Sequence, residues 1–111
     1  MQDDVRARIE ALVWGSEVVL FMKGDLGVPR CGFSGRAVQI LRACLPDMQG
    51  VTAVNVLADE EIRQAMKEYS QWPTFPQLYV RGEFIGGADI MSQMYEAGEI
   101  QALLKRPEGS A

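Results

Sequence analysis

The sequence predicts an α/β fold with a four-stranded mixed sheet flanked by helices. Helical and strand periodicities alternate along the chain in the order α-β-α-β-α-β-β-α-α. The first strand segment is an almost unbroken apolar run, which is typical of a strand buried on both faces of a sheet. The last two strand segments are separated only by Arg81-Gly82, a two-residue hairpin signal. The 111 residues suffice for a single domain.

The first half of the chain is expected to hold two helices and two strands. Val5, Ile9 and Val13 recur at helical spacing, and Gly15 ends that periodicity. In chain order we expect a helix over 5–13, a strand over 17–22, a Gly- and Pro-rich loop over 23–30, a helix from after Cys31 to about Leu45, and a strand over 51–57.

The second half of the chain is expected to hold one helix, then a hairpin of two strands, then two more helices. The first of these helices has three acidic residues in its first turn, Asp59, Glu60 and Glu61, and their negative charge matches the positive end of the helix dipole. Strands follow at 77–80 and 83–85, then a helix with Asp89 as its N-cap, and a short helix over 100–104. We expect a domain core of about 5–104 and a flexible tail at 106–111. A parallel βαβ unit followed by a ββα unit is a thioredoxin-like arrangement.

The composition narrows the class of partner and the compartment. The net charge of −4, from 11 basic and 15 acidic side chains, argues against nucleic acid or an anionic membrane surface as the main partner. Two cysteines are too few for a disulfide scaffold, no secretory signal opens the chain, and no apolar run is long enough to span a bilayer. We therefore expect a reducing, cytoplasmic environment. The chain has no histidine, which removes the commonest general base and zinc ligand.

Cys31 is the main candidate for a reactive group. It follows a strand and a loop and opens a helix, so its thiol is expected to face unpaired backbone N–H groups and the positive end of the helix dipole. Both favour the thiolate, the form that attacks disulfides and binds metals. Lys23, at the end of the preceding strand, adds positive charge nearby. The alternative is a small buried hydrophobic residue, as many free cysteines are.

Ser34 and Cys44 restrict what Cys31 can do. Ser34 stands where a Cys-X-X-Cys oxidoreductase has its second cysteine, so no disulfide can close within the motif. Cys44 lies 13 residues further along the same predicted helix, about 20 Å away and beyond disulfide reach, and we expect it in the core. Cys31 is left to form mixed disulfides with an external thiol or to ligate a soft metal centre. One thiolate without histidine cannot complete a tetrahedral site, so a cluster would need ligands from a second subunit or a small thiol.

Four spaced blocks of the chain form a set. In chain order they are Lys23-Gly24, Pro29-Arg30-Cys31-Gly32-Phe33-Ser34, Trp72-Pro73-Thr74-Phe75-Pro76-Gln77, and Gly86-Gly87 with Asp89. Together they resemble the signature of the Cys-Gly-Phe-Ser monothiol glutaredoxins, and the match runs from about Val5 to Leu104. The resemblance implies a thioredoxin-like fold, a groove for glutathione, and a homodimer that bridges one [2Fe-2S] cluster through two protein cysteines and two glutathione thiols.

The resemblance also implies a function. The leading interpretation is an iron–sulfur cluster carrier or scaffold that delivers clusters to acceptor apoproteins and pairs with BolA-family proteins. The second is a monothiol, glutathione-dependent oxidoreductase in which Cys31 removes glutathione from mixed disulfides, with weak enzyme activity at most. The third is a regulatory adaptor that senses iron or redox state through a partner.

The resemblance assigns Lys23 and Arg63 to one end of glutathione. Both are expected to pair with the carboxylate of its glycine residue, Lys23 as a point charge. Lys23 has an alternative as an ordinary solvated lysine at the end of a strand. Arg63 has an alternative as the ion-pair partner of Asp59 or Glu60 on its own helix.

The other end of glutathione is assigned to the second half of the chain. Thr74-Phe75-Pro76 resembles the thioredoxin-fold loop with a cis proline, which leaves the Phe75 N–H and C=O to pair with the glutathione backbone; core packing is the alternative for Phe75. Gly87 would allow close backbone approach, or end a strand. Ala88 and Asp89 are expected to bind the γ-glutamyl carboxylate and ammonium, although Asp89 has a role as a helix cap besides.

Three further residues or segments qualify the match. Trp72 is expected to pack in its loop or to meet a partner rather than to act in chemistry. Ala88 stands where the family often has cysteine, which matters little if the contact is made by the backbone. The loop Asp25-Leu26-Gly27-Val28 differs from a more Pro-rich form, and because it lies beside Cys31 it bears on how labile a cluster would be.

Overall fold

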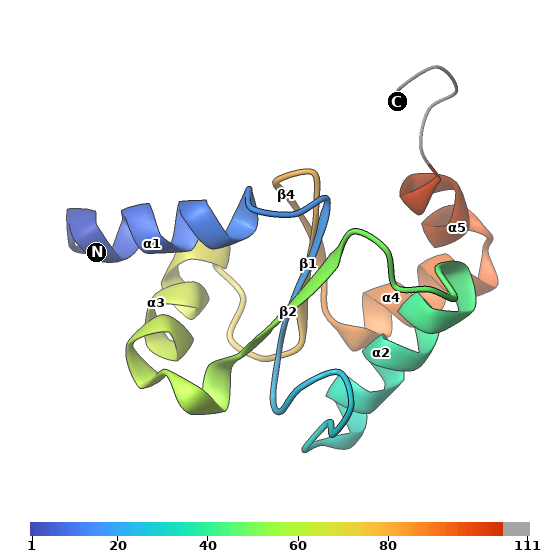
Figure 1. The fold of residues 1–111 in the computed structure, drawn as a ribbon, viewed down its shortest axis with the longest axis horizontal. Coiled ribbons are helices and arrows are strands. Elements are labelled where there is room, and N and C mark those ends of the chain that lie inside the picture. The colour runs from blue at the N-terminus through green and yellow to red at the C-terminus, as the bar shows by residue number, and fades with distance from the viewer. Residues whose placement is uncertain (106–111) are drawn as a thin grey trace.

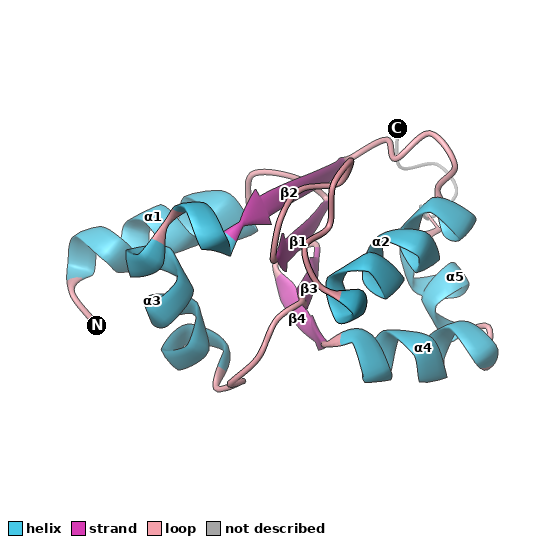
Figure 2. Cartoon of the chain, turned by 90° about the horizontal axis from the view of Figure 1, so that it is seen from below, coloured by secondary structure: helices cyan, strands magenta, loops and turns pink. Residues whose placement is uncertain are grey.

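The computed structural model describes residues 1–105 and places one sheet between two layers of helices (Figures 1 and 2). The strands are β1 (Val18–Met22), β2 (Val51–Asn55), β3 (Gln77–Val80) and β4 (Glu83–Gly86). The helices are α1 (Asp3–Val13), α2 (Gly32–Cys44), the 3₁₀ turn η1 (Val56–Ala58), α3 (Glu60–Ser70), α4 (Ala88–Glu96) and α5 (Glu99–Leu104). The predicted order of elements is confirmed, with the 3₁₀ turn added. The tail expected at 106–111 lies outside the described residues. Over residues 1–105 no helix is both long and apolar enough to cross a membrane.

The sheet has the strand order β2-β1-β3-β4, with β1 in the interior. β1 pairs parallel to β2 and antiparallel to β3, and β3 pairs antiparallel to β4. All five residues of β1 are buried, as its unbroken apolar sequence predicted. The sheet is therefore mixed, and its parallel pair comes from the βαβ unit β1-α2-β2.

Two hydrophobic cores lie on the two faces of the sheet (Figure 2). Because side chains alternate along a strand, Val18, Leu20 and Met22 face the core under α2, α4 and α5. Val19 and Phe21 face the opposite core, which α1 and α3 cover. Each face of β1 thus anchors one helical layer, and the loop that follows β1 emerges between the two layers.

Two sequence predictions about element boundaries were wrong. The strand expected to reach Leu57 ends at Asn55, because the Asn55 side chain accepts hydrogen bonds from the N–H groups of Leu57 (3.0 Å) and Gly24 (3.0 Å) and turns the chain into η1. The N-cap of α4 is Gly87 rather than Asp89, which instead lies in the first turn and makes no capping hydrogen bond. A carboxylate in that turn still matches the helix dipole.

The hairpin between β3 and β4 has the predicted form. Arg81 and Gly82 both have positive φ, 50° and 82°, the combination that a two-residue hairpin turn of the favoured twist requires. The hairpin brings β4 to the edge of the sheet and directs the chain into α4. The start of α4 is thereby placed beside the start of β3 and the loop that precedes it (Figure 1).

Candidate functional site

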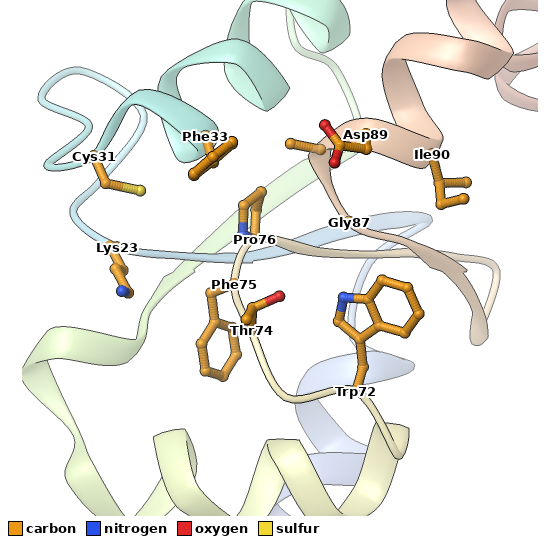
Figure 3. A pocket seen from close by; sticks show the side chains of 11 residues that line it. Lys23, Cys31, Phe33, Trp72, Thr74, Phe75, Pro76, Gly87, Asp89 and Ile90 are labelled. Atoms are coloured by element: carbon orange, nitrogen blue, oxygen red, sulfur yellow. The ribbon is translucent and has the colours of Figure 1, made fainter.

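A cleft of about 520 Å³ lies where four segments meet: the end of β1, the start of α2, the loop before β3 and the start of α4. Its lining residues are Lys23, Cys31, Phe33, Trp72, Thr74, Phe75, Pro76, Gly87, Ala88, Asp89 and Ile90 (Figure 3). Every predicted site residue except Arg63 lies in this lining. Residues more than 60 positions apart in the sequence are therefore brought together at one edge of the sheet.

Cys31 is the N-cap of α2, and its side chain is half-buried. The sulfur accepts a hydrogen bond from the Ser34 backbone N–H at 3.4 Å and lies 3.4 Å from the Ser34 hydroxyl. A sulfur in the N-cap position thus takes the place of the oxygen that serine or aspartate supplies in other helices. The predicted contact between this thiol and the unpaired N–H groups of the helix is confirmed.

The surroundings of Cys31 lower the pKa of its thiol below the ordinary value. Partial burial of the thiol acts in the opposite direction and raises its pKa. The Ser34 hydroxyl, the N–H groups of Ser34 and Phe33, and the charge of Lys23 favour the anion and together outweigh burial. A larger share of Cys31 is therefore ionised near neutral pH than of an ordinary cysteine, and the thiolate is the reactive form.

Ser34 links the thiol to the end of β1. Its side chain is fully buried, and its oxygen accepts a hydrogen bond from the Lys23 backbone N–H at 3.1 Å. With that lone pair occupied, the hydroxyl proton is free to turn toward a Cys31 thiolate. Ser34, which stands in place of the second cysteine of a dithiol motif, thus stabilises the thiolate form of Cys31.

The loop between β1 and α2 closes on itself before it reaches Cys31. The Arg30 N–H donates to the Lys23 carbonyl at 2.9 Å, and Gly24 and Pro29 form an isolated bridge. Gly24 has φ +93°, and a Cβ atom there would lie 2.5 Å from the Val28 carbonyl oxygen, so only glycine fits. The closure fixes Cys31 beside Lys23, at one end of the cleft.

The loop before β3 forms the floor of the cleft. The Phe75–Pro76 peptide bond is cis, as the resemblance implied. The buried Gln77 amide donates to the carbonyls of Trp72 and Thr74, both at 3.1 Å, and holds the loop against the sheet. The Phe75 ring belongs to the core under α1 and α3, whereas its backbone N–H and C=O have no hydrogen-bond partner within residues 1–105. Core packing and a free backbone edge therefore coexist at Phe75.

The start of α4 presents backbone N–H groups to the cleft, an arrangement that suits an anion. The first intrahelical bond runs from the Met91 N–H to the Gly87 carbonyl at 3.0 Å, so the N–H groups of Ala88, Asp89 and Ile90 precede the hydrogen-bond ladder. All three residues line the cleft. A Cβ atom on Gly87 would lie 3.2 Å from Trp72 Nε1 and 3.3 Å from the Pro76 carbonyl oxygen, which shows how closely the two loops approach.

Arg63 and Cys44 lie outside the cleft. The Arg63 guanidinium pairs with Glu60 on its own helix at 3.5 Å, the alternative considered for it, while its Nε is buried without a partner among the described residues. Cys44 is half-buried at the end of α2 and packs against the core, and burial raises the pKa of its thiol. Cys44 thus differs from Cys31 in its position and in the direction in which its surroundings shift the pKa of its thiol.

Four lining residues were not predicted as site residues. Phe33 and Thr74 stand in two of the four sequence blocks that resemble the family signature, and their place in those blocks could have identified both. Trp72 packs against Phe84 with 5.8 Å between ring centroids, as expected, but it also forms one wall of the cleft. Ile90 carried no signal, because one more apolar residue in an amphipathic helix is assigned to the core.

The described part of the chain, residues 1–105, does not by itself offer a complete metal site. Within residues 1–105 no three cysteine, aspartate or glutamate side chains are close enough together to hold a metal ion. Cys31 is the one cysteine in the lining of the cleft. A soft metal centre at Cys31 would therefore take its remaining ligands from outside the chain.

The sheet order, the cis proline facing the cleft and a lone thiol at the N-cap of the helix after β1 define a thioredoxin-like protein with a single active-site cysteine. The Glutaredoxin family model matches residues 18–85, and the chain belongs to that family. With Ser34 in place of the second cysteine of a dithiol motif, it is a monothiol glutaredoxin.

Relatives and solved structures agree with this assignment. The chain is similar to "Uncharacterized monothiol glutaredoxin ycf64-like" of Synechocystis, with 50% identity covering 95% of each chain. It is 43% identical to "Monothiol glutaredoxin-5, mitochondrial" of Schizosaccharomyces pombe, over 95% of this chain and 72% of that protein. Reduced apo GrxS14 of poplar has a similar structure, with a TM-score of 0.74, 46% identity, and coverage of 88% of this chain and 87% of that one.

Proposed function

We propose that this chain binds glutathione in the cleft and carries a [2Fe-2S] cluster as cargo between two copies, for transfer to acceptor apoproteins. The observation that carries the proposal is a single thiol of lowered pKa at one end of a cleft with charged and backbone groups along its length. A lone thiolate of this kind is suited to share a soft metal centre with thiols from elsewhere.

The cleft matches the functional groups of glutathione one by one. Lys23, beside Cys31, suits the carboxylate of the glycine residue. The unpaired N–H and C=O of Phe75 suit the peptide backbone, which would pair with them like an added strand. The free N–H groups at the start of α4, with the Asp89 carboxylate, suit the γ-glutamyl carboxylate and ammonium. In this orientation the glutathione thiol lies beside Cys31.

Arg63 joins this site only if its side chain reorganises. Its guanidinium now pairs with Glu60, which is exposed, and an exposed ion pair of this kind is weak. We propose that Arg63 exchanges Glu60 for the glycine carboxylate when glutathione binds. On this proposal Lys23 is the preformed half of the carboxylate site and Arg63 the half that ligand binding recruits.

Cys31 fits one ligand position of a [2Fe-2S] cluster, and the chain supplies no other thiol at the cleft. Such a cluster takes four ligands, so two copies of Cys31 and two glutathione thiols complete the set. The homodimer is then held by its cargo, and removal of glutathione releases both the cluster and the second copy. Ala88 contributes through its backbone, so the lack of a cysteine side chain there leaves the binding set intact.

The second candidate is a monothiol glutathione-dependent oxidoreductase. The lowered pKa of Cys31 favours it, since a thiolate attacks mixed disulfides. The Cys31 thiolate would attack the glutathione sulfur of a mixed disulfide, and the protein thiolate would leave. A second glutathione thiolate would then attack the Cys31–glutathione disulfide, which frees Cys31 and forms glutathione disulfide. Strong turnover of a small glutathione mixed disulfide by the metal-free protein would favour this reading over the carrier.

One variant tests the carrier proposal against a matched control. We expect Cys31→Ser to abolish both iron binding and dimerisation after reconstitution with iron, sulfide and glutathione. Cys44→Ser removes the other thiol of the chain and is expected to retain both. Size-exclusion chromatography with iron and sulfide analysis reads the two properties together. A coloured dimer formed by Cys31→Ser would refute the proposal.

The remaining expectations follow from the family resemblance. We propose that the protein works in a reducing cytoplasm and that a BolA-family protein can take the place of the second copy. The cytoplasmic environment accords with a Cys31 that has no disulfide partner within reach in the chain. Cell fractionation and co-purification from the native host test the two expectations separately.

A further inference from the structure

The sequence segment around Cys31 has a charge opposite to that of the whole chain. The segment 23–45 carries four of the 11 basic side chains and one of the 15 acidic ones. Arg30 and Arg36 are exposed and have no ion-pair partner among the described residues. The single acid, Asp25, accepts hydrogen bonds from the backbone N–H groups of Gly27 (3.0 Å) and Val28 (2.8 Å), so its charge serves the turn of its own loop.

Two large apolar side chains lie within this positive surface. Val28 is 56% exposed and Phe33 is 60% exposed, and they flank Cys31 in the sequence. In the cleft view Phe33 stands between Cys31 and Asp89 (Figure 3). Arg36 is one turn of α2 beyond Phe33 and so shares its side of the helix. Apolar groups bordered by arginine are the composition of a protein–protein interface.

The helical layer on the opposite side of the sheet mixes acidic and basic side chains. Glu60, Glu61 and Glu68 line a groove between α1 and α3, in the helical layer that the sheet separates from α2 (Figure 2). These three acids are each paired with a cation of the same layer, namely Arg63, Arg8 and the N-terminal ammonium. Arg30 and Arg36 have no such partner among the described residues, so they place a local positive charge beside Cys31, with Asp89 across the cleft as the nearest acid of its lining. Unpaired local charge of this kind orients an approaching partner of opposite charge before contact and raises the rate of productive encounters.

We propose that the surface formed by Val28, Arg30, Phe33 and Arg36, here called the Cys31 rim, is the docking site for a protein partner that presents carboxylates around an apolar group. A second copy of this chain would bring like charges together, and only an anionic centre between the copies offsets that repulsion. An acidic acceptor needs no such compensation. The inference rests on the proposed function, because it identifies the class of acceptor that would displace the second copy.

A nucleic acid is the less suitable occupant. The net charge of the chain is −4, and the positive surface offers few cations for a phosphate backbone. Val28 and Phe33 would also remain uncovered on a purely electrostatic contact. Binding of an oligonucleotide is therefore measured alongside the reaction with peptides.

The test measures how fast metal-free protein reacts with charged probes. Two short peptides share a Leu-Cys-Leu centre and differ in flanking glutamates or lysines, and each cysteine is held as a 2-pyridyl disulfide. The Cys31 thiolate attacks the peptide sulfur, a new Cys31–peptide disulfide forms, and the leaving sulfur takes the electron pair and a proton as neutral pyridine-2-thione, followed by absorbance. A Cys44→Ser background ensures that only Cys31 reports.

We expect the acidic peptide to react about tenfold faster than the basic peptide at low ionic strength, and within about twofold of it in about 0.5 M salt. Arg30→Glu and Arg36→Glu are each expected to reduce the preference by about threefold, whereas Arg6→Glu, an equal charge change on the exposed side of α1, leaves it unchanged. The ratio of the two rates is the readout because a change in the pKa of Cys31 alters both rates alike.

Two kinds of result would overturn the inference. One is kinetic: a rate ratio near one at low salt, or a ratio that Arg6→Glu reduces as much as Arg30→Glu does. The other is tight binding of a DNA or RNA oligonucleotide at physiological salt that Arg30→Glu and Arg36→Glu abolish, which would assign the surface to nucleic acid. Reconstitution of the Cys44→Ser protein without further substitution, using glutathione, iron and sulfide, separates the two proposals: a retained cluster with no acidic preference refutes only the docking surface, and no cluster with a retained preference refutes only the carrier.

Discussion

Replacing Ser34 with alanine tests the link between the fold and the reactivity of Cys31. The Ser34 oxygen accepts the Lys23 N–H at 3.1 Å and lies 3.4 Å from the Cys31 sulfur. Alanine fits the same buried space and removes both contacts. Leaving the partly buried Lys23 N–H without an acceptor costs about 1–2 kcal/mol of unfolding free energy, or roughly 4–8 °C in Tm for a domain of this size.

The same substitution changes the titration of Cys31 in a defined direction. The Ser34 hydroxyl favours the thiolate, so its loss raises the pKa of Cys31 relative to the unsubstituted protein. Because the thiolate is the reactive form, the pH at which alkylation by iodoacetamide becomes fast moves upward. The pH profile of alkylation, followed by mass spectrometry at Cys31, reports this change separately from urea unfolding, which reports the stability.

Ser92→Ala is the matched control for Ser34→Ala. The Ser92 hydroxyl oxygen in α4 is also buried, but it has no hydrogen-bond partner among the described residues. Its removal is expected to change stability by less than about 0.5 kcal/mol and to leave the alkylation profile of Cys31 unaltered. The reasoning fails if Ser34→Ala leaves both the stability and the profile of Cys31 unchanged, or if the two serine variants behave alike.

Three further predictions follow from the cleft. Since the pKa of Cys31 is lowered and that of Cys44 is raised, a pH titration of alkylation should label Cys31 first as pH rises; equal labelling of both thiols at every pH would contradict this. Gly87→Ala places a Cβ atom 3.2 Å from Trp72 Nε1, so we expect a loss of about 1 kcal/mol of stability and weaker glutathione binding by calorimetry, and unchanged affinity would show that the ligand does not approach Gly87. Lys23→Ala removes a carboxylate partner and should weaken glutathione binding by about tenfold while the protein stays folded, and an unaltered affinity would remove Lys23 from the site.

Periodicity predicted the elements better than it predicted their ends. The buried strand β1, the hairpin turn at Arg81-Gly82 and the five α-helices follow from apolar spacing and turn chemistry. The end of β2 depends on Asn55, whose side chain bonds to Gly24 from a distant loop. The same side chain also accepts from the Leu57 N–H two residues on, but the alternation of apolar residues outweighed that local signal, and the contact with Gly24, 31 positions away, leaves none, so the predicted strand ran on to Leu57.

The site shows the same division between local and distant causes. The position of Cys31 at a helix start was readable from the chain, and so was the lack of a second thiol. That Ser34 would bind both Cys31 and the Lys23 N–H was not, because it requires the packing of α2 against the end of β1. Arg63 shows the opposite case, in which a local contact differs from the family pattern. The pattern assigns Arg63 to the ligand, whereas in this structure its guanidinium pairs with Glu60, one turn away on the same helix.

The cluster-carrier proposal is tested most directly by anaerobic purification in the presence of glutathione, read by visible absorbance with iron and sulfide analysis. We predict one [2Fe-2S] cluster for each pair of chains, a dimeric elution volume, and loss of both when glutathione is removed. A colourless monomer that resists reconstitution but turns over glutathione mixed disulfides would contradict the carrier and assign the cleft to thiol–disulfide exchange.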